Sequence, residues 1–116
     1  MIGRAPEVFD RAAFDRQTGG DAALGREIVQ MFLEDCPTRV GEIRAALARG
    51  DAAALIAAAH ALKGSAAYLS ASIVRGHAAD LERLGREARL GDAADALDQL
   101  DAAVAALLLE LTAING

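Results

Sequence analysis

The sequence predicts an all-helical protein, and three observations support this fold class. Hydrophobic residues make up 53% of the 116 residues and aromatic residues only 3%, because alanine and leucine, two strong helix formers, predominate. No segment alternates between apolar and polar residues as a half-buried strand does. Short turn signals separate four long amphipathic segments. We therefore expect a single domain over residues 1–116, an antiparallel up-down four-helix bundle with a short N-terminal lead helix.

The first two predicted helices fill the N-terminal part of the chain. A lead helix of one to two turns is expected over Asp10 to Gln17, with Thr18-Gly19-Gly20 as its end. Asp21 is the expected N-cap of a long segment whose apolar residues recur at helical spacing as far as Arg49-Gly50. Pro37 interrupts this segment, so it forms either one kinked helix or two abutting helices, and we favour one kinked helix.

The next two predicted helices begin after the Arg49-Gly50 turn. Asp51 is the expected N-cap of a helix that runs to about Leu69. Ser70 or Ser72 is expected to cap the following helix, which Gly91 would end.

The last predicted helix has Asp92 as its expected N-cap and an apolar face that continues to Ile114, with Asn115-Gly116 closing it. Its apolar run from Ala102 to Leu109 is far shorter than a membrane span, so we expect no membrane association.

Charge and cysteine content exclude several other classes. The net charge is -5 and the basic residues are scattered, so we expect no nucleic-acid partner. The segment from Met1 to Asp10 carries charged residues where a secretory signal would need an apolar core. Cys36 is the only cysteine, which allows no internal disulfide. The last two features fit a reducing, cytoplasmic setting, and we expect a monomer.

The helix predicted from Asp51 to Leu69 has a core stripe and an opposite face with almost no charge. The stripe, at 100° per residue, consists of Leu55, Ala59, Leu62, Ala66 and Leu69. His60 lies roughly 140° from the centre of this stripe. We expect it to face solvent together with Ala53, Ile56, Ala57, Gly64 and Ala67. Such an apolar surface around one imidazole is typical of a docking face, although an alanine-rich composition alone can also produce it.

Two residues beyond His60 favour a specialised site. Eleven of the twelve basic residues are arginine, and the exception is Lys63, one turn beyond His60. A compact ammonium can follow a phosphoryl group as it arrives and leaves, whereas a guanidinium favours a fixed bidentate partner. Gly64, in mid-helix, costs about 1 kcal/mol relative to alanine. A missing side chain there would let the backbone of a partner approach the imidazole, and the alternative is a chance glycine.

The run His60-Ala61-Leu62-Lys63-Gly64-Ser65-Ala66-Ala67-Tyr68-Leu69 resembles the signature of histidine-containing phosphotransfer (Hpt) domains, the carrier modules of bacterial phosphorelays. The family has similar residues at Phe32-Leu33-Glu34-Asp35-Cys36-Pro37, at Arg49-Gly50-Asp51 and at Leu81-Glu82, so the resemblance extends over nearly the whole chain. It implies a phosphoryl carrier, not a turnover enzyme.

The resemblance also implies a role for each site residue. His60 would be the phosphorylated histidine, Lys63 would assist the phosphoryl group, and Gly64 would permit close approach, with Ser65 in the same motif. Glu82 matches a family position that hydrogen-bonds the other ring nitrogen of the histidine, and its alternative role is that of a solvated helix residue. A carboxylate on Nδ1 would leave Nε2 as the nucleophile and stabilise the charge that develops there.

The partners that the resemblance implies are receiver domains, which would contact Ile56, Ala57, Gly64, Ser65 and Ala67. The receiver should supply an acidic pocket and Mg²⁺, so no cofactor or metal is expected in this chain. The family often has Asn and Gly where this chain has Tyr68 and Ser70, which affects the helix end and the choice of partner more than the chemistry.

Other interpretations of the same residues are weaker. His60 and Ser65 cannot form a nucleophile-base pair, because helix residues five apart point about 140° away from each other. A metal site of His60 and His77 lacks a third ligand, and His77 continues the apolar stripe of its own helix as a packed histidine. The remaining alternative is a helical interaction module that keeps the docking face but carries no phosphoryl group.

Overall fold

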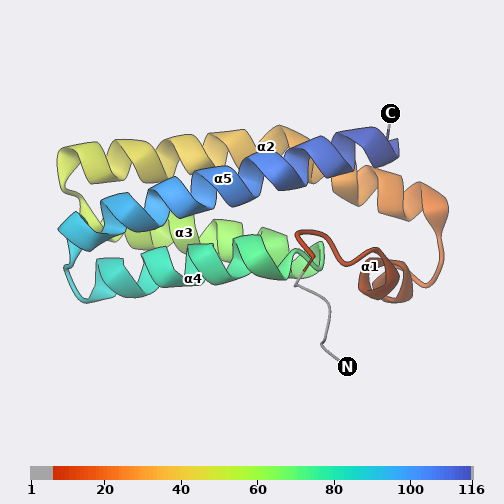
Figure 1. Ribbon diagram of the computed structural model, residues 1–116, viewed down its shortest axis with the longest axis horizontal. Helices are drawn as coiled ribbons and strands as arrows, with labels where there is room; N and C mark the ends of the chain where they lie inside the picture. Colours follow the sequence, from red (N-terminus) through yellow and green to blue (C-terminus); the bar gives the residue numbers. More distant parts are fainter. Residues whose placement is uncertain (1–6, 116) are drawn as a thin grey trace, which may run out of the picture.

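The computed structural model describes residues 7–115, and five helices account for most of this range (Figure 1). These are α1 (Arg11–Gln17), α2 (Ala22–Arg49), α3 (Ala52–Tyr68), α4 (Ser72–Arg86) and α5 (Leu90–Asn115). The predicted all-helical class is confirmed. Most of the Met1 to Asp10 segment and Gly116, on which two expectations depend, lie outside the described residues. No helix within residues 7–115 has the length and apolarity to cross a membrane.

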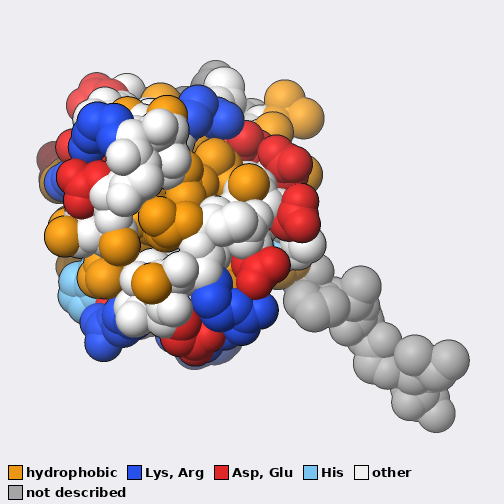
Figure 2. All heavy atoms as spheres, turned by 90° about the vertical axis from the view of Figure 1, so that its left-hand side faces the viewer, with side chains coloured by type: hydrophobic (Ala, Val, Ile, Leu, Met, Phe, Trp, Pro, Cys, Tyr) orange, Lys and Arg blue, Asp and Glu red, His pale blue; other side chains and the backbone are white. Residues whose placement is uncertain are grey.

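The four long helices lie side by side, and the chain reverses direction at each connection between them (Figure 1). Helix α3 packs against α2 and α4, and α5 packs against α4 and α2. Buried apolar side chains from all four helices form one core, to which α1 and the residue before its N-cap add Phe14 and Phe9. Figure 2 views the end that carries the α2–α3 and α4–α5 connections, where apolar side chains gather in the middle and charged ones surround them.

Two of the predicted aspartate N-caps, Asp21 and Asp51, are confirmed, and Asp10, expected as the start of the lead helix, is an N-cap as well. In each case a carboxylate oxygen accepts a hydrogen bond of 3.0 Å from the backbone N–H three residues later; the pairs are Asp10 with Ala13, Asp21 with Leu24 and Asp51 with Ala54. Pro37 lies inside the continuous helix α2, so the single-helix interpretation is confirmed. Packing of the α2 apolar face outweighs the hydrogen bond that proline cannot donate.

The predicted serine cap of α4 is wrong. The N-cap is Ala71, which makes no side-chain hydrogen bond, and Ser72 is the first residue of the helix. Ser70 adopts φ 61°, a left-handed conformation that favours glycine. Its Oγ donates to Oε1 of Gln17 at 3.2 Å, and its carbonyl accepts from the N–H of Asp10 at 3.2 Å. Ser70 therefore links the end of α3 to the lead helix and does not cap α4.

The predicted end of α4 at Gly91 and the predicted N-cap of α5 at Asp92 are also wrong. The turn that needs a left-handed residue falls at Ala88, with φ 56°, and not at Gly91. The N–H of Arg89 closes this turn by donating to the carbonyl of Leu84 at 2.9 Å, as in a Schellman motif. Helix α5 begins at Leu90, so Gly91 and Asp92 lie within its first turn and Asp92 is not an N-cap.

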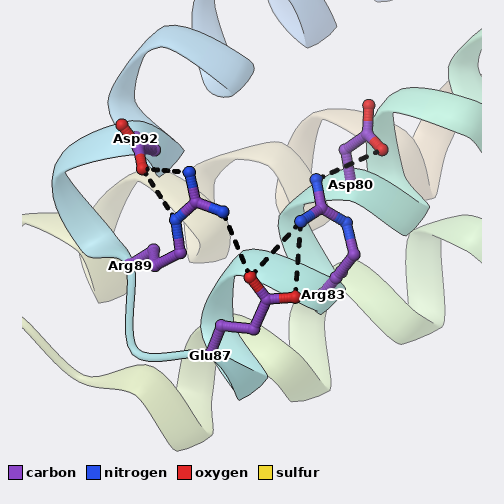
Figure 3. Close-up of polar contacts among 5 residues, drawn as sticks. All are labelled: Asp80, Arg83, Glu87, Arg89 and Asp92. Atoms are coloured by element: carbon purple, nitrogen blue, oxygen red, sulfur yellow. Dashed lines mark hydrogen bonds and ion pairs between the residues drawn. The ribbon is translucent and has the colours of Figure 1, made fainter.

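A network of exposed ion pairs spans this connection (Figure 3). Arg89 contacts Asp92 at 2.7 Å and Glu87 at 3.2 Å. Glu87 also contacts Arg83 at 3.4 Å, and Arg83 lies 3.9 Å from Asp80. These contacts join the last turns of α4 to the start of α5.

Candidate functional site

Helix α3 presents its two faces as the periodicity predicts. Leu55, Ala59, Leu62, Ala66 and Leu69 are fully buried, which confirms the core stripe. His60 projects from the opposite side, and 66% of its side chain is exposed to solvent. Ala58, which lies outside the predicted stripe, is also buried. The imidazole is thus accessible on a helix whose other side is fixed in the core.

Glu82 reaches the imidazole from α4. Its residue is only 4% exposed, and Oε2 lies 3.1 Å from Nδ1 of His60. An ionised carboxylate can only accept a hydrogen bond, so Nδ1 carries the proton and Nε2 has the free lone pair. Among the described residues, no hydrogen bond or ion pair involves Nε2. The alternative role of Glu82 as a solvated helix residue is wrong.

Two cations share the Glu82 carboxylate with His60. The ammonium of Lys63 lies 2.7 Å from Oε1, and the guanidinium of Arg86 lies 2.5 Å from Oε2. Sequence reasoning missed Arg86, although its position four residues after Glu82 on one helix is the usual spacing of a helical ion pair. His60 and Lys63 on α3 and Glu82 and Arg86 on α4 therefore form one polar cluster.

The charge of Glu82 is strongly favoured in this cluster. The hydrogen bond from Lys63, with further contributions from His60 and Arg86, lowers the pKa of Glu82 from 4.5 to about 2, against the opposing effect of burial. Glu82 is therefore an anion at every physiological pH. The fixed negative charge keeps the proton of His60 on Nδ1 and would stabilise positive charge on the ring.

The predicted surface around His60 divides into two groups. Ala57, Gly64 and Ala67 are exposed, and a Cβ at Gly64 would meet no atom within 4 Å, so packing inside this chain does not require glycine there. Ile56 and Ser65 are half-buried. The expectation that Ile56 faces solvent is therefore only partly met, because its side chain packs against α4.

The hydroxyl of Ser65 is directed to its own helix. Its Oγ donates to the carbonyl of Ala61 at 3.2 Å, so the hydroxyl proton that a general base would have to remove is already engaged within the helix.

His77, on α4, is half-buried, and no cluster of three histidine, cysteine or acidic side chains within residues 7–115 is arranged to hold a metal ion. The polar cluster of His60 is the group whose geometry suits nucleophilic chemistry.

The imidazole of His60 faces solvent on a helical bundle, and a buried carboxylate holds its inner nitrogen, an arrangement that suits a histidine that exchanges groups with a partner. The sequence profile of the Hpt domain matches residues 27–110, and the chain belongs to this family of histidine-containing phosphotransfer proteins of phosphorelays. Its members carry phosphoryl groups and are not turnover enzymes.

The fold agrees with this assignment. The chain is similar to the crystal structure of histidine-containing phosphotransfer protein B (HptB) from Pseudomonas aeruginosa PAO1, with a TM-score of 0.89, 22% sequence identity and 96% of each chain covered. A comparison with curated proteins found no match.

Proposed function

We propose that His60 accepts a phosphoryl group from an aspartyl phosphate on one receiver domain and passes it to an aspartate on another. One observation carries the proposal: the buried Glu82 accepts a hydrogen bond from Nδ1 and leaves Nε2 on an exposed side chain. The ring is thereby oriented, held in one tautomer and accessible, which are the requirements of a nucleophile that must meet a second protein.

The chemistry needs only groups that the two proteins supply. The Nε2 lone pair attacks phosphorus, an N–P bond forms, and the bond from phosphorus to the aspartyl oxygen breaks with its electrons leaving on the receiver carboxylate. The ring becomes cationic and keeps its proton on Nδ1, where Glu82 stabilises it. Lys63, one turn beyond His60, places positive charge beside the incoming phosphoryl group. The return step is the reverse of this sequence.

The surface around His60 supports a protein partner. Ala57, Gly64 and Ala67 leave the face of α3 flat and uncharged, so a receiver can bring its own acidic pocket and Mg²⁺ to Nε2. The antiparallel up-down arrangement of α2 to α5 would hold this face rigid. We expect residues 1–116 to act as one domain and as a monomer in the cytoplasm.

The test is transfer of radiolabelled phosphoryl groups from a panel of phosphorylated receiver domains to the full chain. His60→Gln keeps a polar side chain at the site but removes the nucleophile, and His77→Gln is a matched control that changes the other histidine. We expect acid-labile, alkali-stable label on the wild type and on His77→Gln, and none on His60→Gln.

Two results would contradict the proposal. Label that persists in His60→Gln would place the phosphoryl group elsewhere. Binding of receivers without transfer from any of them would favour the interaction module that has a docking face and no relay chemistry.

A further inference from the structure

Gly85 lies on the face of α4 that packs against α3, and it is buried there. A Cβ at this position would lie 2.8 Å from Cγ1 of Ile56, and 3.4 and 3.5 Å from Cδ2 and Cγ of Leu55. Carbon atoms in contact lie about 3.5–4.0 Å apart. The absence of a side chain at Gly85 therefore lets the two helices come closer together than any other residue would allow.

Neither neighbour on α3 can easily make room. Ile56 is β-branched, and in a helix such a side chain has one strongly preferred χ1 rotamer, so its Cγ1 cannot swing away freely. Leu55 is fully buried in the core, where packing is dense. A methyl group at position 85 would therefore displace α4 from α3 and not merely reorient a side chain.

This contact lies one helical turn from the polar cluster. Gly85 follows Glu82 by three residues on α4, and Ile56 precedes His60 by four on α3, so both pairs share a face of their helix. The spacing that Gly85 permits is the spacing at which Oε2 of Glu82 reaches Nδ1 of His60 at 3.1 Å. A shift of several tenths of an ångström would lengthen this bond beyond hydrogen-bonding range.

We propose that Gly85 is a positioning residue: it sets the distance between α3 and α4 that allows Glu82 to orient His60. This inference rests on the proposed function of His60, because its consequence is a slower phosphoryl transfer. Its geometric part, the hydrogen bond between Glu82 and His60, can be measured without any transfer.

The test compares Gly85→Ala with Gly76→Ala in the full chain. Gly76 lies on the same helix and is exposed, and a Cβ at this position would meet no atom within 4 Å, so its variant reproduces the chemical change without the contact. Alanine is the better helix former at both positions. Circular dichroism should show folded helices in both variants.

Two measurements follow the site itself. Nitrogen-proton NMR of the imidazole reports whether His60 keeps its proton on Nδ1. Phosphoramidate, a small donor that needs no docking surface, tests the nucleophile: Nε2 forms a bond to phosphorus and ammonia leaves with the electrons of the broken P–N bond. We expect Gly85→Ala to lose the single tautomer and to react roughly ten- to a hundredfold more slowly. Gly76→Ala should match the wild type in both.

A second variant tests the mechanism and covers the case in which Gly85→Ala does not fold. Ile56→Ala removes the Cγ1 atom that the new methyl would meet. The Gly85→Ala change should therefore cost at most about twofold in rate when made in the Ile56→Ala background. A loss as large as in the wild-type background would overturn the proposal, and so would a Gly85→Ala variant with the wild-type tautomer and rate. Failure of the wild type itself to accept a phosphoryl group would contradict the proposed function, while the tautomer would still decide the role of Gly85.

Discussion

Replacing Glu82 by glutamine should make the stability of this protein less sensitive to acid. The carboxylate contacts Lys63, Arg86 and His60, whereas a glutamine amide can still accept the proton of Nδ1 but carries no charge. The substitution thus removes the electrostatic part of the cluster and preserves the size of the side chain.

The magnitude and its pH dependence follow from the pKa of Glu82, which is lowered from 4.5 to about 2. This corresponds to at most roughly 3 kcal/mol in favour of the folded state. Because 35% of the Lys63 side chain and 63% of the Arg86 side chain are exposed, solvent screens the attraction. We therefore expect about 1–2 kcal/mol. A lowered pKa stabilises the fold fully above pH 4.5, and the effect is lost as the pH falls from 4.5 to about 2.

The assay is urea unfolding of the wild type and Glu82→Gln at pH 7 and near pH 2. The difference in unfolding free energy should be about 1–2 kcal/mol at pH 7 and close to zero at the lower pH. Glu110→Gln is the control, because Glu110 is exposed on α5 and forms no ion pair with another described residue. If the difference in unfolding free energy between the wild type and Glu82→Gln is the same at both pH values, the charge of Glu82 does not stabilise the fold through Lys63 and Arg86.

Three other substitutions test the helix ends by the same unfolding measurement. Ala88→Gly should stabilise the protein by about 1 kcal/mol, because glycine adopts φ 56° without the steric cost of a side chain; a loss of stability would contradict the assigned turn. Asp21→Ala should cost about 1 kcal/mol, since its carboxylate caps α2 through the N–H of Leu24. Asp92→Ala should cost only a few tenths of a kcal/mol, since it loses an exposed ion pair with Arg89 and no cap, and equal losses at the two aspartates would show that Asp92 caps α5 after all.

The features that the sequence predicted correctly are those decided within one or two helical turns. Asp21 and Asp51 each accept a hydrogen bond from a backbone N–H three residues away, so their role depends on local geometry alone. The buried and exposed faces of α3 follow in the same way from helical periodicity around Leu62 and His60.

The wrong predictions for Ser70, for the turn before α5 and for Ile56 concern contacts between residues far apart in the sequence. Serine is a residue type that often caps helices, but the hydroxyl of Ser70 donates a hydrogen bond to Gln17, 53 residues away. Ala88 occupies a turn that Gly91 would fill more easily, because packing of α4 against α5 fixes where the chain must reverse. The half-buried state of Ile56 depends on a glycine of another helix, which periodicity within α3 cannot indicate.

The one-sided exposure of the His60 ring has a consequence for how a relay through this protein is timed. Because Glu82 occupies Nδ1, only Nε2 can receive the phosphoryl group and give it up. Under the proposed function, donor and acceptor therefore approach His60 along one path. They cannot be bound together. The protein would work as a shuttle that exchanges partners in turn, so the first receiver must dissociate before the second can take the phosphoryl group.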